Sequence, residues 1–128
     1  MVKKGLSDRE CEMDISIADS YSYSHWIGNS SIAISRGGAS EKIAVTSLDK
    51  FVAENKLERV DFIKADIEGA ERDMLKGAVS VLKTFAPKLA ICTYHLPDDP
   101  EVLEKIIKEA NPAYRVVHIR KKLFAAIS

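Results

Sequence analysis

The chain has 128 residues, of which 46% are hydrophobic, and its nineteen basic and nineteen acidic side chains give a formal net charge of zero. This length fits one domain with an ordinary core, and the neutral charge gives no electrostatic basis for binding nucleic acid or an anionic membrane. No apolar run approaches the roughly 20 residues of a membrane span, and the lysine-containing start lacks the apolar segment of a secretory signal. Cys11 and Cys92 do not have metal-ligand spacing and are expected to be free thiols, so we predict a cytoplasmic location.

Residues 1–45 form a β-rich segment. Polar and apolar residues alternate over residues 12–18, 30–35 and 41–46, which predicts three half-buried strands. A loop of serines and aromatic residues, DSYSYSHWIGN, joins the first strand to the second. These strands are expected to be antiparallel or to form an excursion from a larger sheet.

Residues 46–128 alternate between helical and strand patterns. The helical patterns cover residues 47–55, 69–84 and 99–111. The apolar runs typical of strands cover residues 60–66, 89–94, 114–119 and 123–127. Asp99 is expected to cap the last helix, with Pro100 in its first turn. This order favours a single α/β domain over residues 1–128, with a mainly parallel sheet and helices on both of its faces.

The stretch VDFIKADIEGAERDMLKG, residues 60–77, organises the rest of the chain. It predicts a buried strand that runs directly into a helix, with Asp66, Glu68 and Glu71 at the turn. His95 follows the next predicted strand. Open α/β sheets bind ligands at the carboxyl ends of their parallel strands. We therefore expect these side chains to share one rim of the sheet.

Four short segments resemble the signature of the FkbM-type methyltransferases. They are TSLD from residue 46, IKADIEGAE from residue 63, LKGA from residue 75 and ICTYH from residue 91. In that family a "tLD" precedes "IKxDxEGxE…LxGA", and an apolar strand then ends in an aromatic residue and a histidine. The resemblance is strongest over residues 46–95. It implies an incomplete Rossmann-like, class I methyltransferase fold, with S-adenosylmethionine as the methyl donor and a hydroxyl of a sugar or natural product as the acceptor.

The resemblance also implies roles for individual residues. Asp66, Glu68 and His95 are expected to be catalytic, either as the general base or as groups that orient the acceptor hydroxyl. Asp66 and Gly69 are expected to contact the donor. The expected contacts to the small-molecule acceptor are Glu71, His25 and Trp26.

Each of these residues also has a purely structural interpretation. Asp66 is suited to capping the turn that follows it. Glu68 and Glu71 place negative charge at a helix N-terminus, which is favourable by about 0.3–1 kcal/mol. A lone histidine such as His95 is often structural, and the serine-rich loop with His25 and Trp26 is more typical of an ordinary surface loop than of a cover over an acceptor pocket.

One departure from the family is large. The glycine-rich turn that cradles the donor has no counterpart, because neither Gly37-Gly38 nor Gly69 and Gly77 have its spacing after a strand. The chain therefore resembles the C-terminal part of the family's domain. One edge of the strand over residues 60–66 would then be unpaired. We expect a homodimer or a complementary chain as partner, and little activity from the isolated chain.

Two other functions stay open. In the first, the chain is a non-catalytic module that binds a partner, or one half of a split methyltransferase. In the second, Asp66, Glu68 and Glu71 bind Mg²⁺ in a metal-dependent enzyme. Three acids in one turn are weak evidence for a metal, and we assign no metal ligand from the sequence.

Overall fold

The computed structural model describes residues 2–17, 30–31 and 39–128 of the chain. The strands of these residues are β1 (Gly5–Leu6), β2 (Cys11–Ile17), β3 (Ser30–Ser31), β4 (Ala39–Thr46), β5 (Phe62–Ala65), β6 (Lys88–Cys92), β7 (Arg115–Ile119) and β8 (Lys122–Ala126). The helices are α1 (Leu48–Glu54), α2 (Glu71–Lys76), α3 (Val79–Thr84) and α4 (Asp99–Ala110). None of these helices is long and apolar enough to cross a membrane.

Most of the predicted strands are confirmed, at somewhat different lengths. β2 and β4 correspond to the strands predicted over residues 12–18 and 41–46. β3 covers only the start of the strand predicted over residues 30–35, the rest of which lies outside the described residues. β1 was not predicted. It pairs in parallel with the end of β4 through Gly5 and Leu6, a stretch too short to show a pattern in the sequence.

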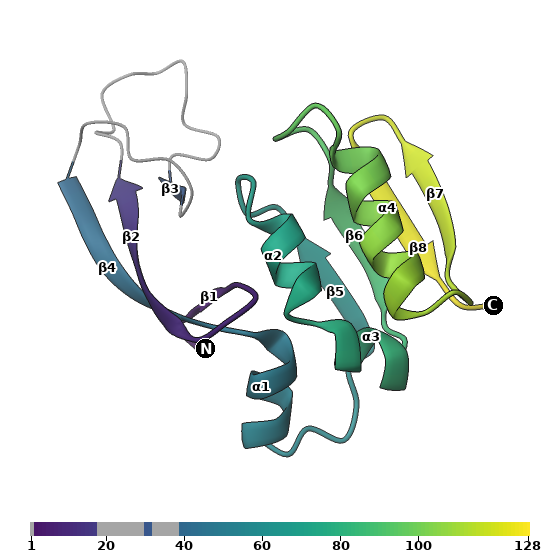
Figure 1. The fold of residues 1–128 in the computed structure, drawn as a ribbon, viewed down its shortest axis with the longest axis horizontal. Helices are drawn as coiled ribbons and strands as arrows, with labels where there is room; N and C mark the ends of the chain where they lie inside the picture. Colours follow the sequence, from purple (N-terminus) through teal and green to yellow (C-terminus); the bar gives the residue numbers. More distant parts are fainter. Residues whose placement is uncertain (1, 18–29, 32–38) are drawn as a thin grey trace.

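The strands form two four-stranded sheets (Figure 1), in the orders β1-β4-β2-β3 and β5-β6-β8-β7. Among the described residues, two strand pairs are parallel, β1 with β4 and β5 with β6, and the others are antiparallel. The prediction of a mainly parallel sheet is therefore wrong, and both sheets are mixed. The physical reason is the tight turn between β7 and β8, where Arg120 has a φ of 54°. This turn reverses the chain at once and makes β8 antiparallel to both of its neighbours.

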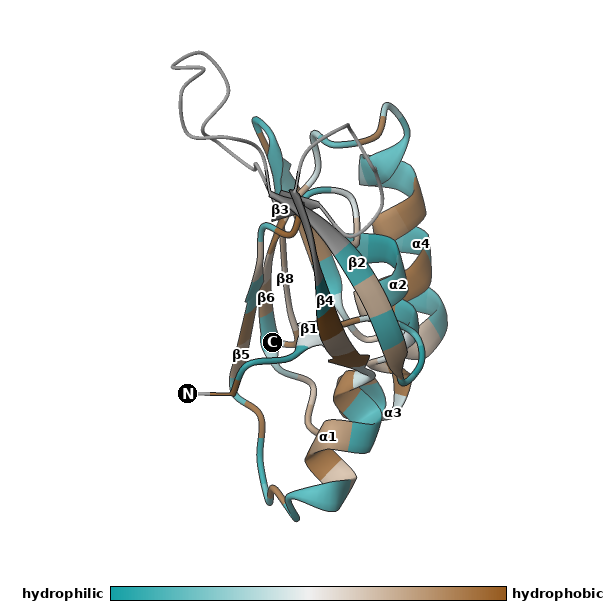
Figure 2. Cartoon of the chain, turned by 90° about the vertical axis from the view of Figure 1, so that its left-hand side faces the viewer, coloured by the Kyte–Doolittle hydropathy of each residue, from teal (hydrophilic) through white to brown (hydrophobic). Residues whose placement is uncertain are grey.

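Helices α2, α3 and α4 lie on one face of the β5-β6-β8-β7 sheet (Figure 2). Alternate strand residues, such as Ile63, Leu89 and Leu123, point into the core beneath these helices and are buried. The opposite face carries Phe62 and Phe124, which are 57% and 40% exposed. The prediction of helices on both faces is therefore not met in the described part of the chain.

The helix predicted over residues 69–84 is broken into α2 and α3 at Gly77. A Cβ atom on Gly77 would lie 2.2 Å from the backbone oxygen of Ser7, so only glycine allows the N-terminal segment to pack this closely. The side chain of Asp49, in the first turn of α1, then caps α3. Its two carboxylate oxygens accept the backbone N–H groups of Ser80 and Val81, each at 2.9 Å. This contact joins α1 to α3.

Candidate active site

The candidate site lies where β5 and β6 end. These two strands are parallel and in register, with Ala65 opposite Ile91, so the loops that follow them emerge at the same edge of the sheet (Figure 1). Asp66 follows β5 directly, and His95 lies three residues after β6. Atom Nε2 of His95 lies 3.6 Å from Oδ1 of Asp66. The expectation that these two residues share one rim is therefore confirmed.

Three carboxylates surround the imidazole of His95. Its Nε2 lies 3.4 Å from Oε2 of Glu68 as well as 3.6 Å from Asp66, and its Nδ1 lies 3.2 Å from Oε1 of Glu71. The His95 side chain is only 9% exposed. Neither ring nitrogen makes a hydrogen bond of good geometry within the described residues, although such groups are normally paired when buried.

The Glu71 carboxylate holds the turn that carries Glu68 and contacts the His95 ring. The residue is 1% exposed, and its two carboxylate oxygens accept the backbone N–H groups of Ile67 at 2.8 Å and Gly69 at 2.9 Å. These bonds hold a turn in which Glu68 has a φ of 58° and Gly69 a φ of 98°. Glu71 is therefore buried and bonded within the turn, and its predicted contact to the acceptor stays a prediction.

Gly69 is needed for its backbone conformation rather than for space. A Cβ atom there would meet only Cβ of His95, at 3.9 Å, which is an ordinary contact. The positive φ, however, favours glycine. Gly69 and Glu68 thus reverse the chain in two residues and present the Glu68 carboxylate toward His95.

A second polar layer, which sequence reasoning missed, joins α2 to the start of α4. Arg72 donates from Nε to Oδ1 of Asp99 at 2.9 Å and from a terminal nitrogen to Oδ1 of Asp98 at 2.6 Å. The bond from Arg72 lowers the pKa of Asp98, and the two aspartates raise the pKa of Arg72. No local spacing links residues 26 or 27 positions apart, so the sequence carried no direct signal for this contact.

The predicted role of Asp99 as the cap of the last helix is wrong. Asp98 occupies the cap position, and α4 begins at Asp99. The Asp99 side chain is 1% exposed and accepts the backbone N–H of Leu96 at 2.9 Å. It therefore fixes the loop that carries His95.

Tyr94, the aromatic residue of the ICTYH segment, also lies at the site. It is 39% exposed, and its hydroxyl donates to Oδ1 of Asp66 at 3.0 Å. Loss of solvent around the phenol, followed by this hydrogen bond, raises the pKa of Tyr94 to about 12, so the hydroxyl stays a donor at neutral pH. Burial, together with the nearby Asp66 carboxylate, also raises the pKa of the Cys92 thiol.

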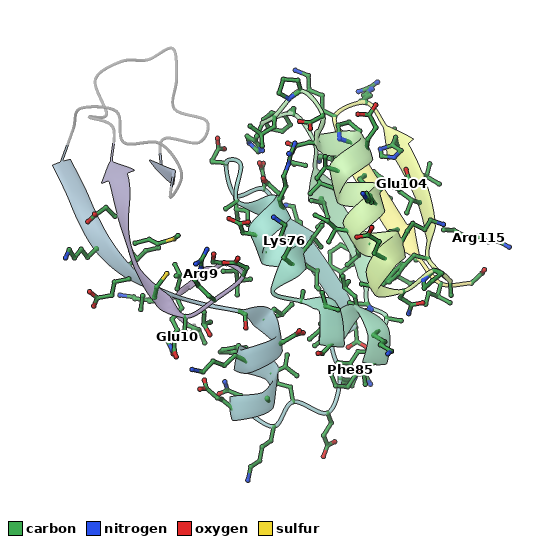
Figure 3. The ribbon with its side chains drawn as sticks, in the orientation of Figure 1. Arg9, Glu10, Lys76, Phe85, Glu104 and Arg115 are labelled. Carbon is green, nitrogen blue, oxygen red and sulfur yellow. The ribbon has the colours of Figure 1, made fainter. Side chains whose placement is uncertain are left out.

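The other predicted residues lie apart from this cluster or outside the described chain. His25 and Trp26, the expected acceptor contacts in the serine-rich loop, lie outside the described residues. His118 is exposed at the sheet edge, where its Nε2 lies 2.7 Å from Glu104 of α4, a residue labelled in Figure 3.

The fold and the site together define an α/β protein with a polar cluster at the carboxyl ends of two parallel strands. The family model described as the methyltransferase FkbM domain matches residues 4–123, which is most of the chain. The chain belongs to this family.

One solved structure is similar over nearly the whole chain. The crystal structure of methyltransferase FkbM from Methylobacillus flagellatus KT matches with a TM-score of 0.64 and 22% sequence identity. The match covers 96% of this chain but only 27% of that one, so this chain spans about a quarter of the similar protein's length. No curated protein matches.

Proposed function

We propose that the chain is the acceptor-side part of an S-adenosylmethionine-dependent O-methyltransferase that acts on a hydroxyl of a sugar or natural product. The observation that carries this proposal is the convergence of Asp66, Glu68 and His95 at the ends of β5 and β6. Membership of the FkbM methyltransferase domain family supports the reaction type.

Such a site has two tasks, which are to align the acceptor hydroxyl with the methyl group and to remove the proton of that hydroxyl. When bound, the donor supplies the methyl group, which the acceptor oxygen displaces from sulfur. Asp66 and Glu68 provide carboxylate oxygens at the rim that accept the hydroxyl proton, and His95 fixes the direction of that hydroxyl. Tyr94 holds the Asp66 carboxylate in place through its hydroxyl.

The residues present fit only part of the donor. The negative charge of Asp66 and Glu68 complements a positively charged sulfonium, and Gly69 leaves the backbone of the turn open to close approach. The glycine-rich turn of the family has no counterpart in the sequence. We therefore expect weak donor binding and little turnover from the chain alone.

Calorimetric titration with S-adenosylmethionine tests this proposal. The wild-type chain is compared with Asp66→Asn and with Asp61→Asn, which changes the same residue type just before the start of β5. Weak saturable binding that Asp66→Asn abolishes and Asp61→Asn preserves is the expected result. Binding that both substitutions reduce equally would contradict the role of Asp66.

A second candidate is one half of a split methyltransferase, which binds a complementary chain carrying the donor-binding part. Two observations favour it. Among the described residues, β5 has a strand partner on one side only. No helix of these residues covers the sheet face that carries the exposed Phe62 and Phe124. No binding of the donor at any concentration, together with binding of such a chain, would favour this candidate over the first.

A further inference from the structure

We propose that Asp66, Glu68 and His95 bind a divalent transition metal ion, of the Zn²⁺ or Mn²⁺ class, at the end of β5. One carboxylate oxygen from each acid and one ring nitrogen lie within 4.8 Å of one another. The proposal is independent of methyl transfer, because metal binding is measured without donor or acceptor. Failure of the proposed function would leave it standing.

The orientation of His95 is the main argument. Its Nε2 lies 3.4 Å from a Glu68 oxygen and 3.6 Å from an Asp66 oxygen, so one nitrogen and two oxygens share one small volume. The ring is 9% exposed, and neither nitrogen is satisfied by a hydrogen bond within the described residues. A metal cation held between the three atoms would offset the repulsion between their lone pairs, as a proton on the ring would in its absence.

The spacing of the donor atoms matches a metal site. Bonds of about 2.0–2.2 Å to nitrogen and oxygen place neighbouring ligand atoms of a tetrahedral site about 3.3–3.6 Å apart. The distances from Nε2 are 3.4 Å to Glu68 and 3.6 Å to Asp66. Three protein ligands leave a coordination position open, and Asp66, at 42% side-chain exposure, faces solvent on that side.

The ligand types select the metal. An imidazole nitrogen suits Zn²⁺ and other first-row transition ions, whereas Mg²⁺ and Ca²⁺ prefer oxygen ligands alone. The Mg²⁺ site considered from the sequence required Glu71 instead of His95. That set is disfavoured because both oxygens of the buried Glu71 accept backbone N–H groups of the turn. The hydrogen bond that Asp66 Oδ1 accepts comes instead from the partly exposed Tyr94 hydroxyl, which can turn to solvent.

A neighbouring set of three residues is a weaker alternative. Glu71, His95 and Asp99 also approach one another within 4.8 Å. The oxygens of Asp99, however, accept from Arg72 and from the backbone of Leu96, so a metal would have to displace a cation and an N–H group. Glu71 is better placed as the partner that orients His95 through Nδ1, as outer carboxylates do for metal-bound histidines.

Titration of the metal-stripped chain with Zn²⁺ and with Mn²⁺, followed by calorimetry, tests the site. We expect one ion per chain and a lower affinity for Mg²⁺. Asp66→Asn and Glu68→Gln should each weaken binding roughly tenfold or more, since each removes a charged ligand. His118→Ala is the matched control and should bind as wild type, because His118 pairs with Glu104 on α4, away from the proposed ligands.

Far-ultraviolet circular dichroism of each variant checks that the fold is intact. Asp66 lies on the exposed rim, so Asp66→Asn should fold as wild type and keep the test interpretable. The proposal is overturned if neither Zn²⁺ nor Mn²⁺ binds saturably up to millimolar concentration. It is also overturned if Asp66→Asn leaves the affinity for both ions unchanged, which would place binding elsewhere, for example at a cysteine.

Discussion

Glu71 is the residue on which the geometry of the candidate site depends. Its carboxylate is buried, and it accepts two backbone N–H groups while facing Nδ1 of His95. A glutamate is the only side chain of this length with two acceptor oxygens and no donor. It therefore fixes the turn and the histidine together.

Replacing Glu71 by Gln should destabilise the fold. The amide group presents an N–H₂ to a backbone N–H, which leaves a buried donor unpaired and costs about 1–3 kcal/mol. Chemical denaturation measures this loss in the free energy of unfolding. Asp73→Asn, two residues further along the same helix and half exposed, is the control. A Glu71→Gln variant as stable as that control would show that the two backbone bonds are unimportant.

Tyr114 gives the fold a dependence on high pH. Its side chain is fully buried, its hydroxyl donates to the carbonyl of Pro87 at 2.7 Å, and burial raises its pKa from 10 to about 12. The folded state therefore holds this proton more tightly than the unfolded state. The stabilisation is complete below pH 10 and is lost as the pH rises toward 12.

The free energy of unfolding should therefore fall between pH 10 and pH 12, with Tyr114 contributing roughly 1.4 kcal/mol for each pH unit. Tyr114→Phe should show a shallower fall, although it is less stable at neutral pH because it lacks the hydroxyl. Denaturant unfolding at several pH values measures both slopes. Parallel slopes for the two proteins would contradict the assignment to Tyr114.

At the scale of elements, α1 and α3 are held together by a cap that crosses between them. Asp49 accepts from the backbone of Ser80 and Val81, and its own backbone N–H donates to the carbonyl of Gly77 at 2.8 Å. The TSLD and LKGA segments of the sequence therefore meet in space. Their contact is structural, and it lies apart from the polar cluster at the end of β5.

Asp49→Ala should destabilise the protein by about 1–2 kcal/mol, because α3 loses the acceptor for two of its first N–H groups. Glu54→Ala, at the other end of α1 and half exposed, should change the stability far less. Thermal unfolding of the two variants measures the difference. Equal midpoints would show that water replaces the cap without cost.

The sequence predicted those elements that short-range patterns determine. Local periodicity predicted the strand before Asp66 and the helix after it. The order of the residues then placed Asp66 and His95 after two neighbouring strands. The break at Gly77 was not predicted, and the close packing of Ser7 against Gly77 involves a residue far away in the chain. The antiparallel pairing of β8 and the exposed position of Tyr94 also depend on tertiary neighbours that no local window contains.

At the scale of the whole molecule, one sheet face is apolar and open. A groove of about 370 Å³ lies on this face, and its walls include Phe62, Val117 and Phe124. Large apolar side chains exposed together are typical of surfaces that bind another protein. The groove lies at the start of β5 and β6, whereas the polar cluster follows the other ends of the same two strands.

We expect the chain to self-associate at high concentration through this face when no complementary chain is present. Val117→Lys with Phe124→Lys should shift sedimentation toward the monomer, because each lysine makes burial of the face costly. Val79→Lys is the control, since Val79 is 42% exposed but lies on α3. A wild-type chain that sediments as a strict monomer at high concentration would contradict this expectation.

The most direct test of the central claim is an amide nuclear magnetic resonance spectrum of the chain, recorded during titration with S-adenosylhomocysteine. This method detects weak binding and locates it by residue. The account predicts that signals from residues 66–69 and 94–96 shift together and saturably, because the loops after β5 and β6 form one site. Shifts confined to the apolar face, or none at millimolar ligand, would contradict the claim that this rim is part of a methyltransferase site.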